Sequence, residues 1–339
     1  MGRVHDLYRR TGADLPFGDP RRAHGVAMEG YYWRLSDSDS GRCVIALCGV
    51  CRAPAPAGAG TAGDGPAAAR WAVVALAAHP GGFVRWRNAP VAAAEPAALG
   101  AAAWDGEGAP ALRGSERRIA VDLGEDARLE AVLEARAGWP GRALGGLGVA
   151  QAAPGLPQYW HPAVLGARVR GTAVLGGETV QLDGWDGYVE KNWGGTFPGE
   201  WWWGQAALGE GAMAAFAGGR LGLGPLAASA LVVRAGGQVV RFTPPGALVT
   251  ASADGGEWRL RARSPRWTAL FEGEAASAPH ILPVPVPAER RAVMRSQHHL
   301  AGRLRVTLRR GRRTVLRAES ALAGLEHGVP APAGGAAPA

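Results

Sequence analysis

The sequence is short of several residue types, and each shortage argues against a class of protein. Only three cysteines occur, Cys43, Cys48 and Cys51. They are too few to staple a secreted scaffold, and no second ligand pair accompanies them to complete a zinc site. We therefore predict that all three are small, buried apolar side chains. No stretch of about 18 apolar residues is free of charge, glycine and proline, which argues against a membrane-spanning helix.

Motifs that mark common cofactors and nucleophiles are also missing. The sequence contains no phosphate-binding P-loop, no Gly-x-Gly-x-x-Gly that opens a helix after a strand, and no Gly-x-Ser-x-Gly. We therefore expect no redox cofactor and no metal. Residues 1–6 lack the apolar segment of a secretion signal, so a cytoplasmic location is the default expectation.

Lysine is almost absent, and arginine carries most of the positive charge. Lys191 is the only lysine, while the formal net charge is +8. Arginines alternate with apolar residues on both sides of Gly311, which predicts a hairpin with one arginine face and one apolar face. We interpret the arginine face as solvated, with peripheral contact to an anionic membrane surface as the alternative. Nucleic acid is not expected as a partner, because no aromatic residue interleaves these arginines. They are Arg303, Arg305, Arg309, Arg310, Arg312, Arg313 and Arg317.

Glycine and proline are abundant, with 52 and 25 residues. They break long helices and suit short strands joined by turns. Gly-Gly pairs at 176–177 and 236–237 separate alternating apolar runs, which is a specific hairpin signal. The sequence therefore predicts an all-β, antiparallel fold. Clear strands are expected at residues 42–51, 70–78, 117–122, 127–134, 172–175, 179–182, 230–234, 238–242 and 257–263.

Stretches without a hydrophobic period divide the chain. Residues 53–69 and 89–103 are rich in alanine, glycine and proline, and we predict loops or insertions there. A shift in proline and glycine content between residues 150 and 165 predicts a boundary. We therefore divide the chain into units at residues 1–155 and 156–327, followed by a disordered tail at 328–339. Similar strand-turn-strand patterns at residues 171–190 and 302–326 fit two related β halves, and chance similarity between hairpins fits as well.

Tryptophan is concentrated in one segment. Five of the 13 tryptophans lie between residues 185 and 203, next to the only lysine. In strand geometry one face carries Asp186, Tyr188, Glu190 and Asn192, and the other carries Val189, Lys191 and Trp193. After a turn at residues 194–199, Trp201, Trp203 and Gln205 again point one way. We predict a hairpin in which a polar, ionisable row faces a wall of indoles.

This segment resembles the signature of the tocopherol cyclase family. The matching residues are Gly187-Tyr188-Val189-Glu190-Lys191-Asn192-Trp193-Gly194, then Phe197-Pro198 and Trp201-Trp202-Trp203-Gly204-Gln205. Glu29-Gly30-Tyr31-Tyr32-Trp33 and Gly324-Leu325-Glu326 resemble the family's terminal elements. The resemblance implies two lipocalin-like halves, as barrels or a sandwich, around an apolar cavity. It also implies an isomerase of vitamin E biosynthesis that closes a chromanol ring on a prenylated hydroquinone. Asn192 stands where relatives often carry Asp, which leaves the substrate itself open.

Ring closure of this kind needs a proton on the alkene, and a carboxyl group in a dry pocket stays protonated because desolvation raises its pKa. Our candidates for the proton donor are Asp186 and Glu190, with Lys191 as an electrostatic partner. Alternation places Lys191 opposite Glu190, so the two act together only if a bulge intervenes. Candidate substrate-binding residues, which line the cation or orient the aromatic head group, are Glu29, Tyr31, Tyr188, Trp193, Trp201, Trp203 and Gln205.

Two other functions fit the same residues. A non-catalytic carrier of an isoprenoid or another apolar ligand needs the cavity but no acid, so its carboxyls would be exposed or salt-bridged. A sugar-active enzyme would use Glu190 and Glu200 as a carboxyl pair. Hydration or another cyclisation of a terpenoid alkene would use the same acid as the chromanol reaction. We expect His161, His298 and His299 to serve as hydrogen-bonding residues rather than metal ligands.

Overall fold

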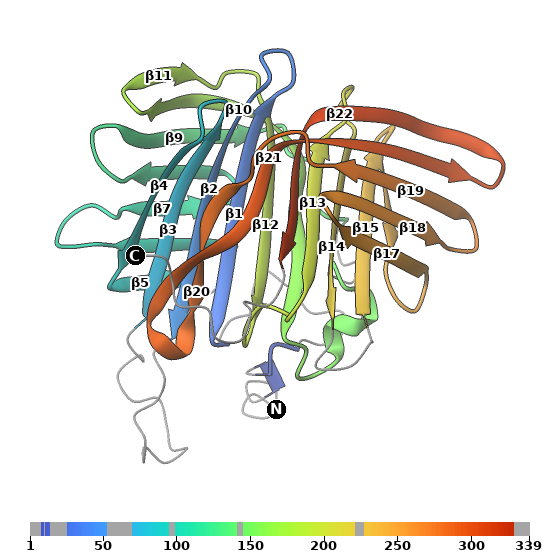
Figure 1. Cartoon of the computed structure of the whole chain (residues 1–339), viewed down its shortest axis with the longest axis horizontal. Helices are drawn as coiled ribbons and strands as arrows, with labels where there is room; N and C mark the ends of the chain where they lie inside the picture. Colours follow the sequence, from blue (N-terminus) through green and yellow to red (C-terminus); the bar gives the residue numbers. More distant parts are fainter. Residues whose placement is uncertain are drawn as a thin grey trace.

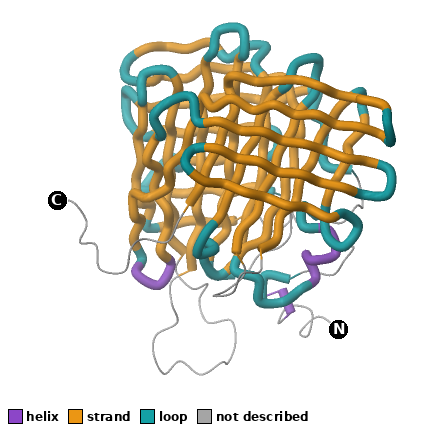
Figure 2. Tube along the Cα trace, turned by 45° about the vertical axis from the view of Figure 1, so that its right-hand side comes forward, coloured by secondary structure: helices purple, strands orange, loops and turns teal. Residues whose placement is uncertain are grey.

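The protein consists of two antiparallel β-sheets, each curled around its own core and packed against the other (Figures 1 and 2). The computed structural model describes residues 8–9, 11–13, 26–52, 70–94, 99–140, 145–220 and 227–328. Within these ranges the regular structure is almost entirely strand, with short 3-10 turns at Gly148–Ala152 and Pro287–Glu289. The predicted all-β fold is therefore confirmed. Among the helical segments in these ranges, none has the length and apolar character needed to cross a membrane.

The first sheet is built from residues 28–194 in the order β4-β3-β2-β1-β12-β10-β9-β8-β7-β6-β5, with β11 paired to β10. Its strands are β1 (Met28–Asp37), β2 (Arg42–Arg52), β3 (Arg70–His79), β4 (Phe83–Ala89), β5 (Val91–Ala94), β6 (Gly100–Trp104), β7 (Leu112–Ser115), β8 (Arg118–Asp122), β9 (Ala127–Glu134), β10 (Gln158–Leu175), β11 (Glu178–Gln181) and β12 (Asp186–Gly194).

The second sheet follows the order β16-β15-β14-β13-β22-β21-β19-β18-β17, with β20 paired to β21. Its strands are β13 (Trp201–Ala207), β14 (Met213–Arg220), β15 (Ala227–Ala235), β16 (Gln238–Phe242), β17 (Leu248–Asp254), β18 (Glu257–Arg263), β19 (Trp267–Glu274), β20 (His280–Val286), β21 (Arg291–Arg310) and β22 (Arg313–Gly328). Among the described strands, the edges of each sheet are not paired with each other. Two β halves are thus confirmed, but as open sheets; the barrel alternative is wrong.

Strand alternation sends neighbouring side chains into different layers. In β1, Trp33 packs into the core enclosed by the first sheet, while Tyr32 packs between the two sheets. Strands β2 and β3 contact β5 and β6 of the same sheet, so this sheet curls around its own core. The second sheet encloses a separate core that contains Phe216 and Phe271. The three cysteines are free and buried, as predicted.

The predicted tryptophan hairpin at residues 185–205 does not form. Strand β12 pairs with β1 and β10, whereas β13 pairs with β14 and β22. Residues 195–200 carry the chain from one sheet to the other instead of turning it back. A turn-rich connection between two strands is compatible with either path, and the strand partners decide. The polar face of β12 still meets the indoles of β13, because the two strands lie on facing sheets.

Residues 89–103 are not simply loop, because β5 and β6 pair there with each other. Alanines alternate between buried and exposed positions in β5, but alanine is too small to reveal this period in sequence. The predicted loop at 53–69 and the tail beyond Gly328 lie outside the described residues. The sheets change over at residues 195–200, whereas the division into units at residue 155 stays a prediction.

The predicted arginine hairpin is formed by β21 and β22, which turn at Gly311. Leu304, Val306 and Leu308 are buried in the second core, while Arg303, Arg305 and Arg309 beside them are exposed. The carboxylate of Glu319 pairs with two of these arginines across the hairpin. One face is therefore apolar and the other is charged and solvated.

Candidate functional site

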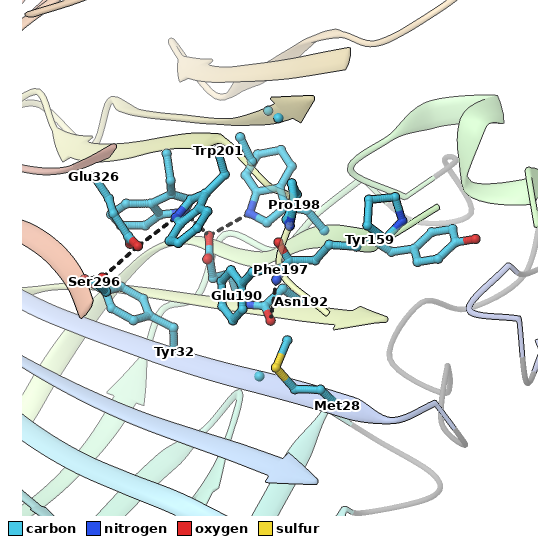
Figure 3. A pocket seen from close by; sticks show the side chains of 18 of the residues that line it. Met28, Tyr32, Tyr159, Glu190, Asn192, Phe197, Pro198, Trp201, Ser296 and Glu326 are labelled. Atoms are coloured by element: carbon cyan, nitrogen blue, oxygen red, sulfur yellow. Dashed lines mark hydrogen bonds between the residues drawn. The ribbon is translucent and has the colours of Figure 1, made fainter. Parts of the chain in front are cut away.

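A cavity of about 210 Å³ lies between the two sheets (Figure 3). Strands β1, β2, β10 and β12 line it from the first sheet, and β13, β14, β15, β20, β21 and β22 line it from the second. Its ionisable and polar lining residues include Tyr32, Gln158, Glu190, Asn192, Ser229, Ser296, His298 and Glu326. Most of the remaining wall is aromatic or aliphatic, including Trp160, Trp201, Trp203, Leu147, Leu156 and Leu282. The cavity therefore suits an apolar ligand with few polar groups.

Glycines give the indoles room to pack at this cavity. A Cβ atom on Gly328 would lie 2.0 Å from the ring of Trp201, and one on Gly218 would lie 2.2 Å from Nε1 of Trp202. Both distances are far below van der Waals contact. Larger residues at these two positions would displace the indoles from the cavity wall.

Glu190 is the central acidic group of the first sheet. Its strand β12 runs between β1 and β10, and Glu190 is paired with Tyr32 of β1. Oε2 accepts hydrogen bonds from the Tyr188 hydroxyl at 2.5 Å, from Nε1 of Trp160 at 2.8 Å and from Nε1 of Trp203 at 2.9 Å. Among the described residues Oε1 has no such partner, and this atom is not completely buried. Oε1 therefore borders the cavity.

Burial raises the pKa of the Glu190 carboxyl from 4.5 to about 7, because only 3% of the residue is exposed and the charged form is poorly solvated. The hydrogen bonds from Tyr188, Trp160 and Trp203 lower the pKa and offset part of this effect, while the charge of Glu326 adds to the rise. No salt bridge to Glu190 occurs within the described residues. The group therefore carries a transferable proton near neutral pH.

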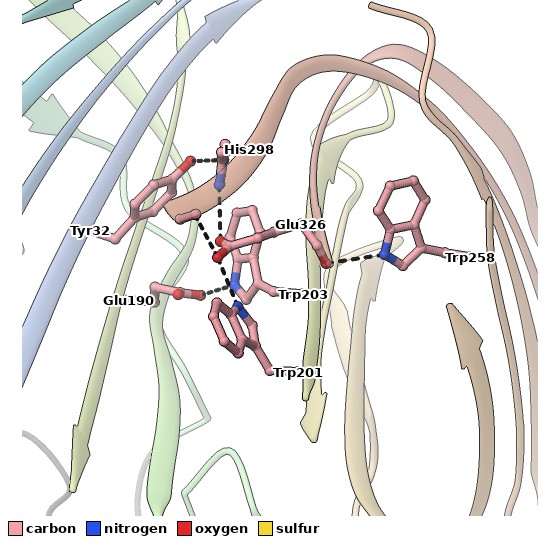
Figure 4. Close-up of polar contacts among 8 residues, drawn as sticks. Tyr32, Glu190, Trp201, Trp203, Trp258, His298 and Glu326 are labelled. Carbon is pink, nitrogen blue, oxygen red and sulfur yellow. Dashed lines mark hydrogen bonds and ion pairs between the residues drawn. The ribbon is translucent and has the colours of Figure 1, made fainter. Parts of the chain in front are cut away.

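A second carboxyl group, Glu326 of β22, lies in the opposite wall (Figure 4). Its Oε1 accepts hydrogen bonds from Nε1 of Trp201 at 2.8 Å and from Oγ of Ser296 at 2.7 Å. Its Oε2 lies 3.1 Å from Nδ1 of His298, and Nε2 of that histidine lies 3.1 Å from the Tyr32 hydroxyl. A continuous polar chain thus runs from Glu326 to the first sheet.

The two carboxyl groups have opposite protonation preferences. Burial by itself raises the pKa of Glu326, but the hydrogen bonds from His298, Ser296 and Trp201, together with the charge of His298, lower it below its usual value. At a pH at which Glu190 still carries its proton, Glu326 is therefore already ionised. Paired groups whose environments drive their pKa values apart are the typical arrangement of an acid and a base.

The structure brings four of the predicted site residues together. Glu190, Trp201 and Trp203 line the cavity, and the Tyr188 hydroxyl is hydrogen-bonded to Glu190. Tyr31 also borders the cavity, but its hydroxyl donates to Glu29 at 3.0 Å.

Other predicted site residues lie on the opposite face of β12 or outside the cavity wall. Nζ of Lys191 is 3.3 Å from Oε2 of Glu29, and both side chains are buried. Nζ also lies 5.4 Å from the ring centres of Tyr31 and Trp193. Trp193 stacks on Tyr159 in a separate cluster. The bulge beside Glu190 lies in β10, between Pro162 and Val164, and β12 pairs with β1 in unbroken register, so Lys191 stays on the face opposite Glu190.

Asp186 and Gln205 are also absent from the cavity lining. Asp186 lies at the start of β12, where its half-buried carboxylate is 3.3 Å from Nη1 of Arg168. Burial raises its pKa, while Arg168 lowers it. Gln205 is buried on β13, two residues beyond Trp203.

Several residues of the site were not assigned to it from the sequence, namely Tyr32, Trp160, Ser296, His298 and Glu326. Glu326 belongs to the Gly-Leu-Glu element that resembles the family, and His298 belongs to a pair of adjacent histidines. The sequence therefore contained a signal for both residues. Tyr32 neighbours the predicted Tyr31, and only the strand register shows which of the two faces Glu190. Nothing local distinguishes Ser296 or Trp160.

The carboxyl pair of the sugar-active alternative does not share this cavity. Glu200 forms an ion pair with Arg220 and a hydrogen bond with His327, and it is not part of the lining. Of the other histidines considered, His161 contacts the Trp139 ring and His299 is hydrogen-bonded to the Ser277 carbonyl oxygen.

Comparisons with known proteins agree with the motif. The tocopherol cyclase-like family matches residues 150–329, which is slightly more than half of the chain. No curated protein matches the sequence significantly. Similar solved structures include kievitone hydratase from Nectria haematococca (9% identity, TM-score 0.51, 89% of each chain) and CghA with Sch210972 (13% identity, TM-score 0.53, 90% of this chain and 89% of that one). These likenesses show a shared fold. The family match, which includes Glu190, Trp203 and Glu326, shows that this chain belongs to the tocopherol cyclase-like family.

Proposed function

We propose that the protein is an intramolecular cyclase that protonates a prenyl alkene and closes a chromanol ring on a prenylated hydroquinone. This places it among the isomerases, since the reaction only rearranges bonds within its substrate. The family membership supports a cyclase, and one observation carries the assignment. The buried carboxyl of Glu190 borders an apolar cavity and has a pKa raised to about 7.

In this proposal Glu190 donates its proton to the less substituted carbon of the alkene, so that a tertiary cation forms at the other carbon. Oε1 faces the cavity, while three donors hold Oε2 in place. As the carboxylate forms, these donors stabilise its charge without rearrangement, which is the arrangement that lowers a barrier most effectively. Asp186 is a poorer donor, since it lies outside the cavity and faces Arg168.

The aromatic wall completes the proposed site. The indoles of Trp201 and Trp203 border the cavity, and an indole face stabilises a desolvated cation by roughly 1 to 2 kcal/mol. Apolar walls also exclude the water that would capture the cation. The substrate hydroxyl then attacks the cation and closes the ring.

A carrier of an apolar ligand is the competing function. A carrier needs no buried acid, and an unpaired carboxyl in its wall would weaken binding of a hydrocarbon chain. Glu190 is buried, has no salt-bridge partner among the described residues and borders the cavity, which favours the cyclase.

The experiment that tests the proposal combines ligand recovery with turnover. The purified protein is extracted for copurifying lipids, and prenylated hydroquinones are then incubated with it and analysed for ring closure. We expect conversion to a chromanol, which is lost in Glu190→Gln and retained in Asp186→Asn. An apolar ligand recovered without any turnover would instead identify a carrier. A tertiary alcohol as the main product would identify a hydratase that uses the same acid.

A further inference from the structure

Ring closure requires a proton acceptor as well as a donor, and this inference rests on the proposed function. The attacking hydroxyl oxygen must lose its proton when it forms the new carbon–oxygen bond. Glu190 is a carboxylate once the alkene has received its proton, but the three hydrogen bonds to its Oε2 weaken it as a base for this second proton transfer. A second acceptor is therefore expected among the polar groups that line the cavity but take no part in the proposed protonation.

Tyr32, His298 and Glu326 form such a group (Figure 4). The Tyr32 hydroxyl oxygen lies 3.1 Å from Nε2 of His298, and Nδ1 of His298 lies 3.1 Å from Oε2 of Glu326. All three residues line the cavity, and Tyr32 and His298 are largely buried. Two of them come from the second sheet and Tyr32 comes from the first, so the chain spans both walls.

The hydrogen-bond network assigns the protons along this chain. The ionised Glu326 can only accept, so Nδ1 of His298 carries a hydrogen, and in the neutral imidazole Nε2 is then the acceptor. The Tyr32 hydroxyl then donates to Nε2, and the buried guanidinium of Arg34, which lies near the same hydroxyl, favours negative charge on its oxygen. This order of groups matches that of a nucleophile, an imidazole base and an orienting carboxylate.

The surroundings hold the carboxylate in place. Trp201 and Ser296 both donate hydrogen bonds to Oε1 of Glu326, and Nε1 of Trp258 donates to the backbone carbonyl oxygen of Glu326 at 3.1 Å. The remaining oxygen is thereby directed at His298. The ring of Trp203 contacts both Tyr32, at 5.1 Å between centres, and His298, at 5.2 Å, so it fixes the two partners against one another.

We propose that Tyr32, His298 and Glu326 form a relay that accepts the hydroxyl proton of the substrate during ring closure. The substrate hydroxyl donates to the Tyr32 oxygen as the new carbon–oxygen bond forms, while the Tyr32 proton moves to Nε2 of His298. Glu326 stabilises the resulting imidazolium. In this relay Tyr32 is a catalytic residue, and His298 and Glu326 are positioning residues that act through it.

The proton balance closes over one turnover. Glu190 gives one proton to carbon, and the relay gains one from oxygen, so the substrate is isomerised without a co-reactant. Tyr32 and Glu190 are register partners on neighbouring strands, which places the relay and the acid next to one another. After the product leaves, the imidazolium returns its proton to the Glu190 carboxylate through water that enters the cavity.

The test compares Tyr32→Phe, His298→Gln and Glu326→Gln with the wild type, using a dimethylallyl hydroquinone and its fluorinated analogues as probes. Glu319→Gln, an exposed carboxylate on the same strand β22, is the matched control. We expect ring closure to fall about 100-fold in the three relay variants and to stay within about twofold in the control. Thermal unfolding checks that each variant is folded, and Tyr32→Phe, which removes a single oxygen atom, is the mildest.

The fluorinated probes separate a relay from a structural role. Fluorine makes the substrate hydroxyl more acidic, so the loss in Tyr32→Phe should shrink as fluorine atoms are added. In D2O the relay variants should still transfer deuterium to the alkene, which is detected in recovered substrate or in the trapped alcohol. A loss that is uniform across the probes, or wild-type rates in Tyr32→Phe and Glu326→Gln, would overturn the relay alone. An unreactive wild type would overturn the cyclase itself, and an active Glu190→Gln would overturn Glu190 as its acid.

Discussion

Replacing Glu190 with glutamine tests the central chemical step, because it removes the proton while keeping the shape. The amide oxygen can accept the three hydrogen bonds that Oε2 receives from Tyr188, Trp160 and Trp203. The amide nitrogen then faces the cavity and has no proton that it can transfer to an alkene. General acid catalysis contributes about 100- to 10,000-fold, so we expect turnover to fall by at least about 100-fold.

The pH dependence gives the same residue a second signature. With a pKa of about 7, the protonated fraction of Glu190 is half at neutral pH, so the wild-type rate should fall tenfold per pH unit above it. The titratable groups that face this carboxyl are Tyr188 on its own strand, Tyr32 on β1, and His298 and Glu326 on the opposite sheet. Initial rates measured from pH 5 to 9 locate this descending limb.

Stability should respond to the same proton. The folded state holds the proton of Glu190 more tightly than the unfolded chain, so stability is lost as pH rises from 4.5 to about 7. Moving the pKa over this range corresponds to about 3 kcal/mol of unfolding free energy. Glutamine does not titrate, so the unfolding free energy of Glu190→Gln should not show this fall. Relative to the wild type, the variant should therefore become about 3 kcal/mol more stable between pH 4 and pH 8. Parallel stability curves from urea unfolding, or undiminished turnover, would refute the assignment of Glu190 as a buried acid.

Further changes test the surroundings of this acid and the charged surface. Trp203→Phe keeps an aromatic ring but removes one donor to Glu190, so the descending limb of the rate profile should move to higher pH. Lys191→Met leaves the Glu29 carboxylate buried without this cation, and we expect about 3 to 5 kcal/mol of destabilisation in urea unfolding. Adding Glu29→Gln should recover most of it, and a double variant no more stable than the single one would contradict the ion pair. We also propose that the arginine hairpin contacts anionic membranes. Reversing the charge of the four arginines between residues 309 and 313 should then abolish co-sedimentation with phosphatidylserine vesicles, because each arginine contributes roughly 1 kcal/mol of attraction to an anionic surface. Unchanged sedimentation would exclude this role.

The division of the site between two sheets explains why the sequence located some functional residues and missed others. Alternation along β12 correctly separates Glu190 from Lys191, since adjacent strand residues point to opposite faces. The same rule separates Tyr31 from Tyr32, but it cannot tell which of the two meets the acid. That depends on the register between β1 and β12, which pairs Tyr32 with Glu190.

Strand partners are the information that the sequence lacks. Gly-Gly turns mark local hairpins such as β15 and β16, because two residues with positive φ must join the strands. The connection at residues 195–200 carries no comparable signal, and the chain crosses there to the other sheet. Glu326 reaches the cavity because β22 pairs with β13, more than a hundred residues earlier in the chain.

The sequence by itself determined the all-β class, the alternating faces of each strand and the tryptophan-rich signature of the family. These follow from a two-residue period and from local turn chemistry, which are properties of neighbouring residues. Only the tertiary structure decided that the cavity lies between two open sheets, that the buried carboxyl of Glu190 borders it, and that Glu326 and His298 lie in its opposite wall. The reason is physical: desolvation and hydrogen bonding set the charge of a carboxyl group, and both depend on side chains contributed by distant strands.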